Sequence, residues 1–82
     1  MNLTIYSKNG CIYCDRIKKV ASYLQEKRSY SITVNELGVD FTASQFYEKF
    51  GGGSTFPQIL LNDEHLGGCV DTINYLQEHN LL

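Results

Sequence analysis

Two cysteines, Cys11 and Cys14, stand where one periodicity of the sequence gives way to another. Before them, Leu3–Tyr6 is short and alternating and ends in a polar turn, a pattern typical of a strand. From Ile12 to about Arg28 the apolar residues recur at steps of three and four, which predicts a helix with one apolar stripe. The chain therefore has to fold so that a Cys-x-x-Cys pair lies at a strand-to-helix junction.

A second strand is predicted at Tyr30–Val34, where apolar and polar residues alternate again. Strand, crossover helix and strand form a βαβ unit, which closes with parallel pairing. A further helix begins with a capping box of Thr42 and Gln45 and a hydrophobic staple, and it ends at the glycine run 51–53. The staple residues are Phe41 and Phe46.

The last part of the chain predicts a hairpin and a third helix. Pro57 stands just before the strand Gln58–Leu61, a place where its missing N–H is tolerated, and the turn Asn62-Asp63 leads to the strand 64–66. A helix follows from about Val70 to His79, with Asp71 as its N-cap and Ile73, Tyr75 and Leu76 facing inward. The order βαβαββα predicts an α/β fold: a small mixed sheet with helices on its faces, as one domain over residues 1–82.

Charge and composition exclude several classes of partner. The net charge is −2 with no basic run, which argues against binding of nucleic acid. No apolar stretch approaches the ~18 residues that cross a bilayer. The N-terminus lacks a basic region followed by an apolar stretch, so we expect a cytoplasmic protein. Three cysteines are an odd number and make a poor disulfide framework in a reducing compartment.

The Cys-x-x-Cys pair predicts redox chemistry. Cys11 lies at the predicted helix N-terminus, where unpaired N–H groups and the helix dipole favour a thiolate, and Lys8 adds positive charge nearby. Arg16, Lys18 and Lys19 raise the positive field further. Cys14, one turn inside the helix, is then the less exposed, resolving thiol. The alternative is half of a zinc site, completed by His65 and Cys69.

Two more segments suggest a binding site. In Thr55-Phe56-Pro57 a cis proline bond would expose the backbone of Phe56 to an extended peptide, although the proline alone is equally consistent with the start of an edge strand. In Gly67-Gly68-Cys69-Val70-Asp71 the glycines allow close approach of a ligand, and the helix N-terminus offers N–H donors to a carboxylate. Taken alone, this segment is more consistent with a plain loop that ends in an N-cap.

Together, these three segments make the chain resemble a glutaredoxin from Leu3 to the last helix. The resemblance rests on the segments 8–14, 55–57 and 67–71, in that order. It implies a minimal thioredoxin fold with a four-stranded mixed sheet and three helices. It also implies reduction of protein disulfides and glutathione mixed disulfides, with glutathione as electron donor and no tightly bound cofactor or metal. Ribonucleotide reductase is a usual client of small members, and we expect a monomer.

Carried over by position, the resemblance makes Cys11 the nucleophile and Cys14 the resolving cysteine. Lys8 and Tyr13 match positions that contact glutathione, and Phe56, beside Pro57 and Thr55, matches the residue that pairs with its cysteine moiety. Gly68, Cys69, Val70 and Asp71 match the loop that holds its γ-glutamyl end.

The chain departs from the family pattern at three positions. Ile12 replaces a common proline, Phe56 a valine, and Ser54 a basic residue. Two alternative functions stay open: a redoxin recharged by thioredoxin reductase, and a dimer that binds an iron–sulfur cluster through Cys11 and glutathione.

Overall fold

The computed structural model describes residues 1–82 and has the predicted order of elements, βαβαββα. The elements are β1 (Asn2–Ser7), α1 (Ile12–Arg28), β2 (Ser31–Glu36), α2 (Ala43–Phe50), β3 (Gln58–Leu61), β4 (Glu64–Gly67) and α3 (Cys69–Glu78). Three helices and a four-stranded mixed sheet make this the minimal thioredoxin fold that the resemblance implied.

The sheet has the strand order β2-β1-β3-β4. β1 pairs in parallel with β2 and antiparallel with β3, and β3 pairs antiparallel with β4. The tight turn between β3 and β4 holds Asn62 and Asp63 at φ of 48° and 69°, the left-handed conformation that two-residue hairpin turns require. The predicted βαβ unit and hairpin are both confirmed.

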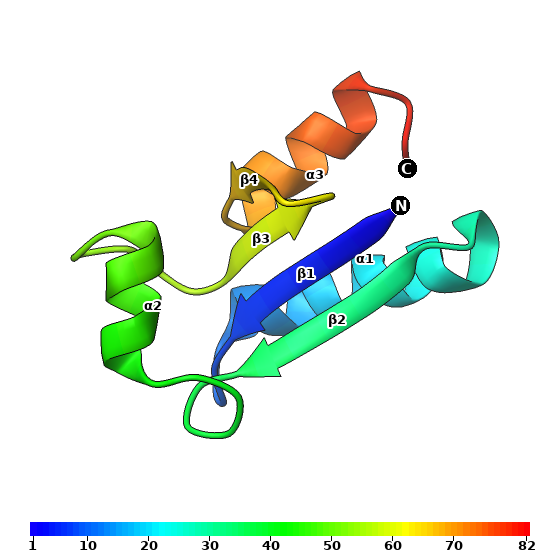
Figure 1. The fold of residues 1–82 in the computed structure, drawn as a ribbon. Coiled ribbons are helices and arrows are strands. Elements are labelled where there is room, and N and C mark those ends of the chain that lie inside the picture. The colour runs from blue at the N-terminus through cyan, green and yellow to red at the C-terminus, as the bar shows by residue number, and fades with distance from the viewer.

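The hydrophobic core lies between one face of the sheet and the two helices α1 and α3, which cover the same face (Figure 1). Side chains of β1 and β3 point alternately into this layer, so Leu3, Ile5 and Ile59 are fully buried. The stripe predicted on α1 meets them, and Leu76 of α3 closes the layer. The stripe residues that are buried are Ile17, Ala21 and Leu24.

The second strand begins one residue later than predicted and runs two residues further. Ser29 ends α1 in the left-handed region at φ 59°, and the parallel register then pairs Asn2 with Ser31. Tyr30 therefore lies in the connection, with its ring in the core. Burial raises the pKa of the Tyr30 hydroxyl, against a smaller lowering by Arg28.

Helix α2 stands at the end of the sheet, apart from α1 and α3 (Figure 1). Its capping box is confirmed: the Thr42 hydroxyl accepts from the N–H of Gln45, and the Gln45 side chain accepts from the N–H of Thr42. The staple is confirmed too, because the rings of Phe41 and Phe46 stack at 5.8 Å. Phe46 is the one buried residue of this helix, so α2 is attached mainly through an aromatic side chain.

The start of α3 corrects one prediction. Asp71 is not the N-cap: the helix begins at Cys69, and Gly68 is the capping residue, with extended backbone angles and no side chain to bond the helix. Asp71 lies in the first turn instead, where its charge still suits the helix dipole. Its side chain packs against Gly67, the last residue of β4, which extends one residue beyond the predicted strand 64–66.

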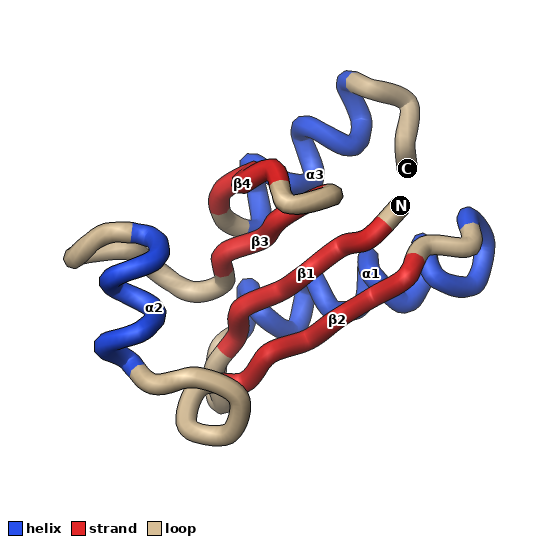
Figure 2. The backbone as a smooth tube through the Cα atoms, in the orientation of Figure 1, coloured by secondary structure: helices blue, strands red, loops and turns tan.

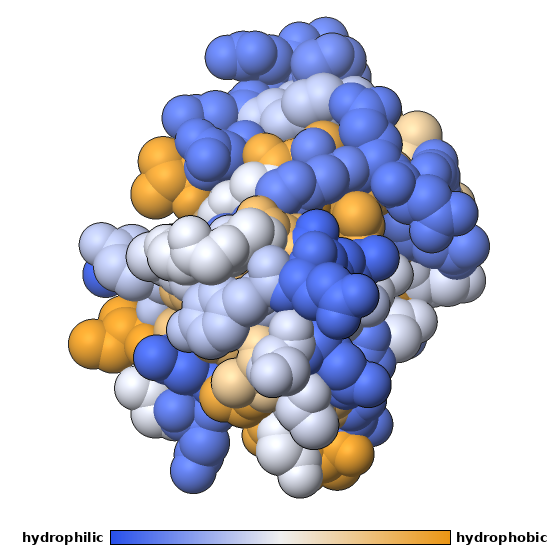
Figure 3. All heavy atoms as spheres, turned by 60° about the vertical axis from the view of Figure 1, so that its left-hand side comes forward, coloured by the Kyte–Doolittle hydropathy of each residue, from blue (hydrophilic) through white to orange (hydrophobic).

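Three connections meet at one end of the sheet: the loops after β1 and β2 and the loop before β3 (Figure 2). The two chain termini lie close together at the opposite end (Figure 1), where the Arg28 guanidinium donates to the carbonyl of Leu82 at 3.0 Å. The face shown in Figure 3 is mostly polar, with hydrophobic residues in scattered groups. None of the helices combines the length and the apolar character that a membrane span requires.

Replacing the α2 cap should lower stability by a measurable amount. Thr42→Ala removes the side-chain acceptor for the Gln45 N–H, and we expect the free energy of unfolding to fall by about 1 kcal/mol. Thr42→Ser keeps the hydroxyl and should stay close to the wild type in urea denaturation. Equal losses in both variants would contradict the role of the hydroxyl.

Candidate active site

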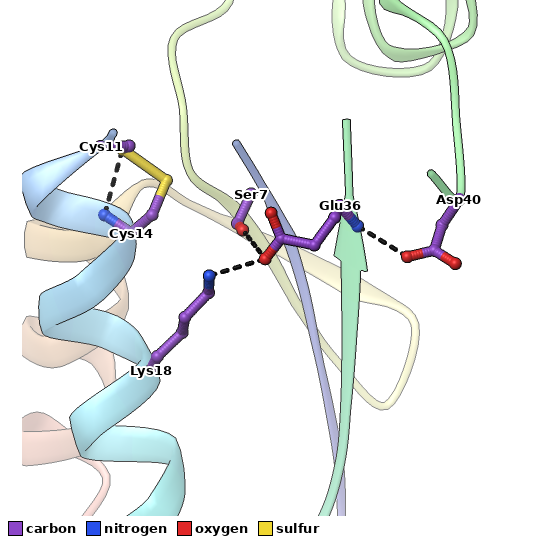
Figure 4. A network of polar contacts seen from close by, with 6 residues as sticks. All are labelled: Ser7, Cys11, Cys14, Lys18, Glu36 and Asp40. Carbon is purple, nitrogen blue, oxygen red and sulfur yellow. Dashed lines mark hydrogen bonds and ion pairs between the residues drawn. A yellow bond between two sulfur atoms is a disulfide. The ribbon is translucent and has the colours of Figure 1, made fainter. Parts of the chain in front are cut away.

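Cys11 is the N-cap of α1, as its predicted place at the helix N-terminus requires. Its backbone is extended (φ −112°, ψ 111°), and its sulfur accepts a hydrogen bond from the N–H of Cys14 at 3.2 Å. The two cysteines, with Cα atoms 5.1 Å apart, are joined by a disulfide (Figure 4). The start of the helix thus holds a disulfide, with a helix N–H directed at the sulfur of Cys11.

The two sulfurs differ in their access to solvent. Cys14 is fully buried and Cys11 is 8% exposed, which confirms that Cys14 is the less exposed of the two. Between them, Ile12 and Tyr13 are 68% and 49% exposed. Cys11 is therefore the more accessible of the two cysteines, and the exposed side chains that follow it are one apolar and one aromatic.

A cleft of about 200 Å³ borders the pair. It brings together the three segments that the sequence singled out: part of the Cys-x-x-Cys motif, the proline loop and the start of α3. Its lining residues are Tyr13, Thr55, Phe56, Pro57, Gly68, Cys69, Val70 and Asp71. The first three N–H groups of α3 have no partner inside the helix, so one wall of the cleft carries hydrogen-bond donors.

The backbone of Phe56 lies beside the cysteine pair. The Phe56–Pro57 bond is cis, as one of the two interpretations of the sequence had it. The carbonyl oxygen of Phe56 lies 3.8 Å from the sulfur of Cys11, and neither its N–H nor its carbonyl has a backbone partner. A peptide lying in the cleft can therefore pair with Phe56 in the manner of an added strand.

The loop that carries Phe56 is held by side-chain hydrogen bonds that no sequence pattern predicts. The Gln58 amide donates to the Thr55 carbonyl at 2.8 Å, and its oxygen lies 2.7 Å from Nε2 of His65 on β4. The ring of His65 in turn lies 5.0 Å from that of Phe50. Hydrogen bonds between residues on different strands leave no local periodicity, which is why sequence reasoning missed them.

Of the predicted site residues outside the cysteine pair, only Lys8 does not line the cleft. Its ammonium lies over the ring of Phe56, 5.3 Å from the centroid. The guanidinium of Arg16 lies over the ring of Tyr13 at 5.0 Å. Both cations thus border the site and rest on aromatic rings that line it.

The charge of Lys18 is compensated, which corrects its predicted contribution to the positive field. Its ammonium donates to Glu36 at 2.6 Å, and Ser7 donates to the same carboxylate oxygen at 2.6 Å (Figure 4). These two hydrogen bonds hold the pKa of the Glu36 carboxyl below its usual value. The N–H of Glu36 donates to the carboxylate of Asp40. Through its own carboxylate, Glu36 links the end of β2 to Lys18 on α1 and Ser7 on β1.

Cys69 is a free thiol, 5% exposed, at the start of α3. Burial raises the pKa of this thiol, and the charge of Arg16 opposes the shift more weakly. Cys69 is therefore a packed side chain, and the raised pKa disfavours the thiolate, which is the reactive form of the group. The structure does not gather Cys69, His65 and the Cys11–Cys14 pair into one group of potential metal ligands.

Comparison with known proteins identifies the family of this chain. The family model named Glutaredoxin matches residues 3–66. The chain belongs to the glutaredoxin family. It is 38% identical to glutaredoxin 3 of Escherichia coli over 72 residues, which cover 85% of this chain and 80% of that protein.

Solved structures agree with this assignment. Reduced Escherichia coli glutaredoxin superimposes on this glutaredoxin with a TM-score of 0.79 at 27% identity, covering 98% of both chains. A buckwheat glutaredoxin–glutathione complex does so with a TM-score of 0.68 at 25% identity, over 96% of this chain and 71% of that one. With its Cys11–Cys14 pair, this glutaredoxin is a thiol–disulfide oxidoreductase.

The ion pair behind the disulfide should add stability that acid removes. The folded-state pKa of Glu36 is lowered, so its contribution is fully present above the ordinary value of 4.5 and is lost as the pH falls through the folded-state pKa. We expect Glu36→Gln to lower the free energy of unfolding by about 1 kcal/mol at neutral pH, since the pair is partly exposed.

Urea denaturation at a series of pH values checks this. The difference between wild type and Glu36→Gln should narrow below pH 4.5. Glu26→Gln is the matched control, because Glu26 pairs with Lys27 only at 3.8 Å on the open surface. A difference that widens in acid would refute the assignment.

Proposed function

We propose that this glutaredoxin reduces protein disulfides and glutathione mixed disulfides with glutathione as electron donor. The observation that carries the proposal is the single cleft that joins Tyr13, the Phe56 backbone and the start of α3 beside Cys11. Such a cleft offers separate groups to each part of a γ-glutamyl tripeptide. The similar buckwheat protein was solved as a glutathione complex, which supports the choice of ligand.

The binding residues are assigned by the chemistry of each end of glutathione. Its cysteine moiety pairs with the free N–H and carbonyl of Phe56, beside Thr55 and Pro57. Its γ-glutamyl carboxylate accepts from the N–H groups of Cys69 and Val70 at the α3 N-terminus. Gly68, which has no side chain, lets the ligand approach this part of the backbone closely. Its ammonium pairs with Asp71, and Lys8 and Tyr13 border the opposite side.

The reaction is a series of thiol–disulfide exchanges. The Cys11 thiolate attacks one sulfur of the substrate disulfide, forming a mixed disulfide and releasing the first substrate thiolate. Cys14 loses its proton and attacks the sulfur of Cys11, which releases the second thiolate and leaves the Cys11–Cys14 disulfide. One glutathione thiolate then opens that disulfide at Cys11. A second attacks the bound glutathione sulfur, so glutathione disulfide leaves and the dithiol is restored.

With a glutathionylated substrate Cys11 suffices, which gives a test of the two roles. We expect Cys14→Ser to keep most of its activity on a glutathione mixed disulfide, since Cys11 alone takes up and passes on the glutathione. Cys11→Ser should lose that activity entirely. NADPH oxidation coupled through glutathione reductase measures both. A Cys11→Ser protein that works at the wild-type rate would disprove the assignment.

The same assay separates the alternative functions. Turnover that needs thioredoxin reductase and NADPH, with no contribution from glutathione, would identify a redoxin of the other type. A brown protein with visible absorption bands after purification without oxygen would indicate a cluster-bound dimer. Wild-type turnover that saturates with a glutathione mixed disulfide supports the proposal.

Gly67 should matter for the same site through the space beside Asp71. It has a φ of +112°, and a Cβ here would lie 2.7 Å from Oδ2 of Asp71, so an added methyl group must displace the carboxylate. We expect Gly67→Ala to raise KM for a glutathione mixed disulfide about fivefold, the equivalent of ~1 kcal/mol, with a smaller effect on kcat.

A glycine in open space provides the control. Gly52→Ala adds a Cβ with no atom within 4 Å and should leave KM unchanged. Steady-state kinetics on both variants checks the comparison. An unchanged KM in Gly67→Ala would show that the position of Asp71 does not influence binding.

A further inference from the structure

The ring of Phe56 joins three parts of the molecule that the proposed function treats separately. Its backbone borders Cys11, its ring stacks on Phe46 of α2 with centroids 4.0 Å apart and planes at 10°, and Lys8 lies over it. Phe41 stacks on it as well, with centroids 6.2 Å apart. The ring is therefore held by an aromatic stack while the Lys8 ammonium lies over it.

Lys8 has no competing partner. The two ion pairs of the structure, Lys18–Glu36 and Lys27–Glu26, use other residues, and no hydrogen bond engages the Lys8 ammonium. An exposed lysine in a polar turn samples many rotamers, and immobilising it on binding costs free energy. The face of Phe56 restricts that freedom in advance, because a cation within about 6 Å of a ring is attracted to it.

We infer that Phe56 is a positioning residue. Its ring holds the Lys8 ammonium where the ammonium can pair with a carboxylate of the bound γ-glutamyl tripeptide. Glutathione carries two carboxylates and one ammonium. The start of α3 takes the γ-glutamyl end in the proposed function on which this inference rests. The glycyl carboxylate then lies toward the other side of the cleft, where Lys8 is the cation on the ring of a lining residue.

Helix α2 thereby contributes to the binding site through Phe46. Phe46 is the buried residue of that helix, and its ring is parallel to that of Phe56. The position of α2 thereby sets the position of the ring, and the ring sets that of the cation. A glutaredoxin with a valine at this place has no aromatic face to offer Lys8.

A double-mutant cycle tests the inference. Phe56→Leu keeps an apolar side chain against Phe46 and removes the aromatic face, and we expect KM for a glutathione mixed disulfide to rise about two- to fivefold with kcat little changed. In a Lys8→Met background the same substitution should leave KM nearly unchanged, because the cation that the ring positions is already gone. The cycle is measured at low and high salt, and the coupling should shrink at high salt.

Lys49→Met is the matched control for charge. Lys49 also lies over aromatic rings, at 6.0 Å from Tyr6 and 5.7 Å from Phe50, on the far part of the same aromatic group. Its removal should change KM much less than Lys8→Met does. A second readout needs no turnover: in NMR spectra the side-chain protons of Lys8 should show a ring-current shift that Phe56→Leu abolishes.

The outcomes separate this inference from the proposed function. A wild type with no glutathione-dependent turnover overturns the proposed function and this inference with it. A wild type that turns over, with Phe56→Leu raising KM by the same factor in both backgrounds, overturns the inference alone. Coupling between the two substitutions together with the loss of the ring-current shift supports it.

Discussion

The structure depends on the burial of one face of β1 and β3 beneath α1 and α3. Leu3, Ile5 and Ile59 meet the stripe of α1 and Leu76 of α3 in a layer from which water is excluded. This apolar contact orients the two helices so that both begin at the same end of the sheet. Two helix N-termini, each with unpaired N–H groups, therefore converge on one cleft. The chemistry of the site follows from where the core places these ends.

Two of the three cysteines are joined in a disulfide at the start of α1, and the third is a free thiol at the start of α3. Cys11 caps a helix and accepts an N–H bond, whereas Cys14 sits one turn further in and is shielded from substrate. Cys69 also lies at a helix start, but burial raises the pKa of its thiol and works against the thiolate. Cys69 thus shows that position at a helix N-terminus does not by itself lower the pKa of a thiol when burial opposes it.

Local sequence signals were enough to predict every helix and strand, because each depends on periodicity, caps or turns within one segment. The capping box of Thr42 and Gln45 and the left-handed turn at Asn62 are examples. The errors arose where a contact joins distant segments. The pairing of Lys18 with Glu36 compensates a predicted positive charge, and it joins α1 to β2 without any local pattern in either element.

The N-cap of α3 was also predicted wrongly, and parts of the site could not be predicted at all. Asp71 is a favourable N-cap residue by type, but the backbone angles of Gly68 decide where the helix begins. The three segments of the cleft could be found as motifs, and their convergence follows from the fold. The stack of Phe46 on Phe56 could not be found, because aromatic residues of a helix and a loop carry no signal of their mutual orientation.

The neighbouring chain ends have a consequence for how this domain can be used in engineering. Arg28 and the carbonyl of Leu82 meet at the end of the sheet opposite the loops that form the cleft. A fusion partner, an affinity handle or a surface tether attached at either terminus would extend away from Cys11. Because the two ends are neighbours, a short linker between them also makes the chain a candidate for circular permutation, with new ends opened in a surface loop remote from the cysteine pair.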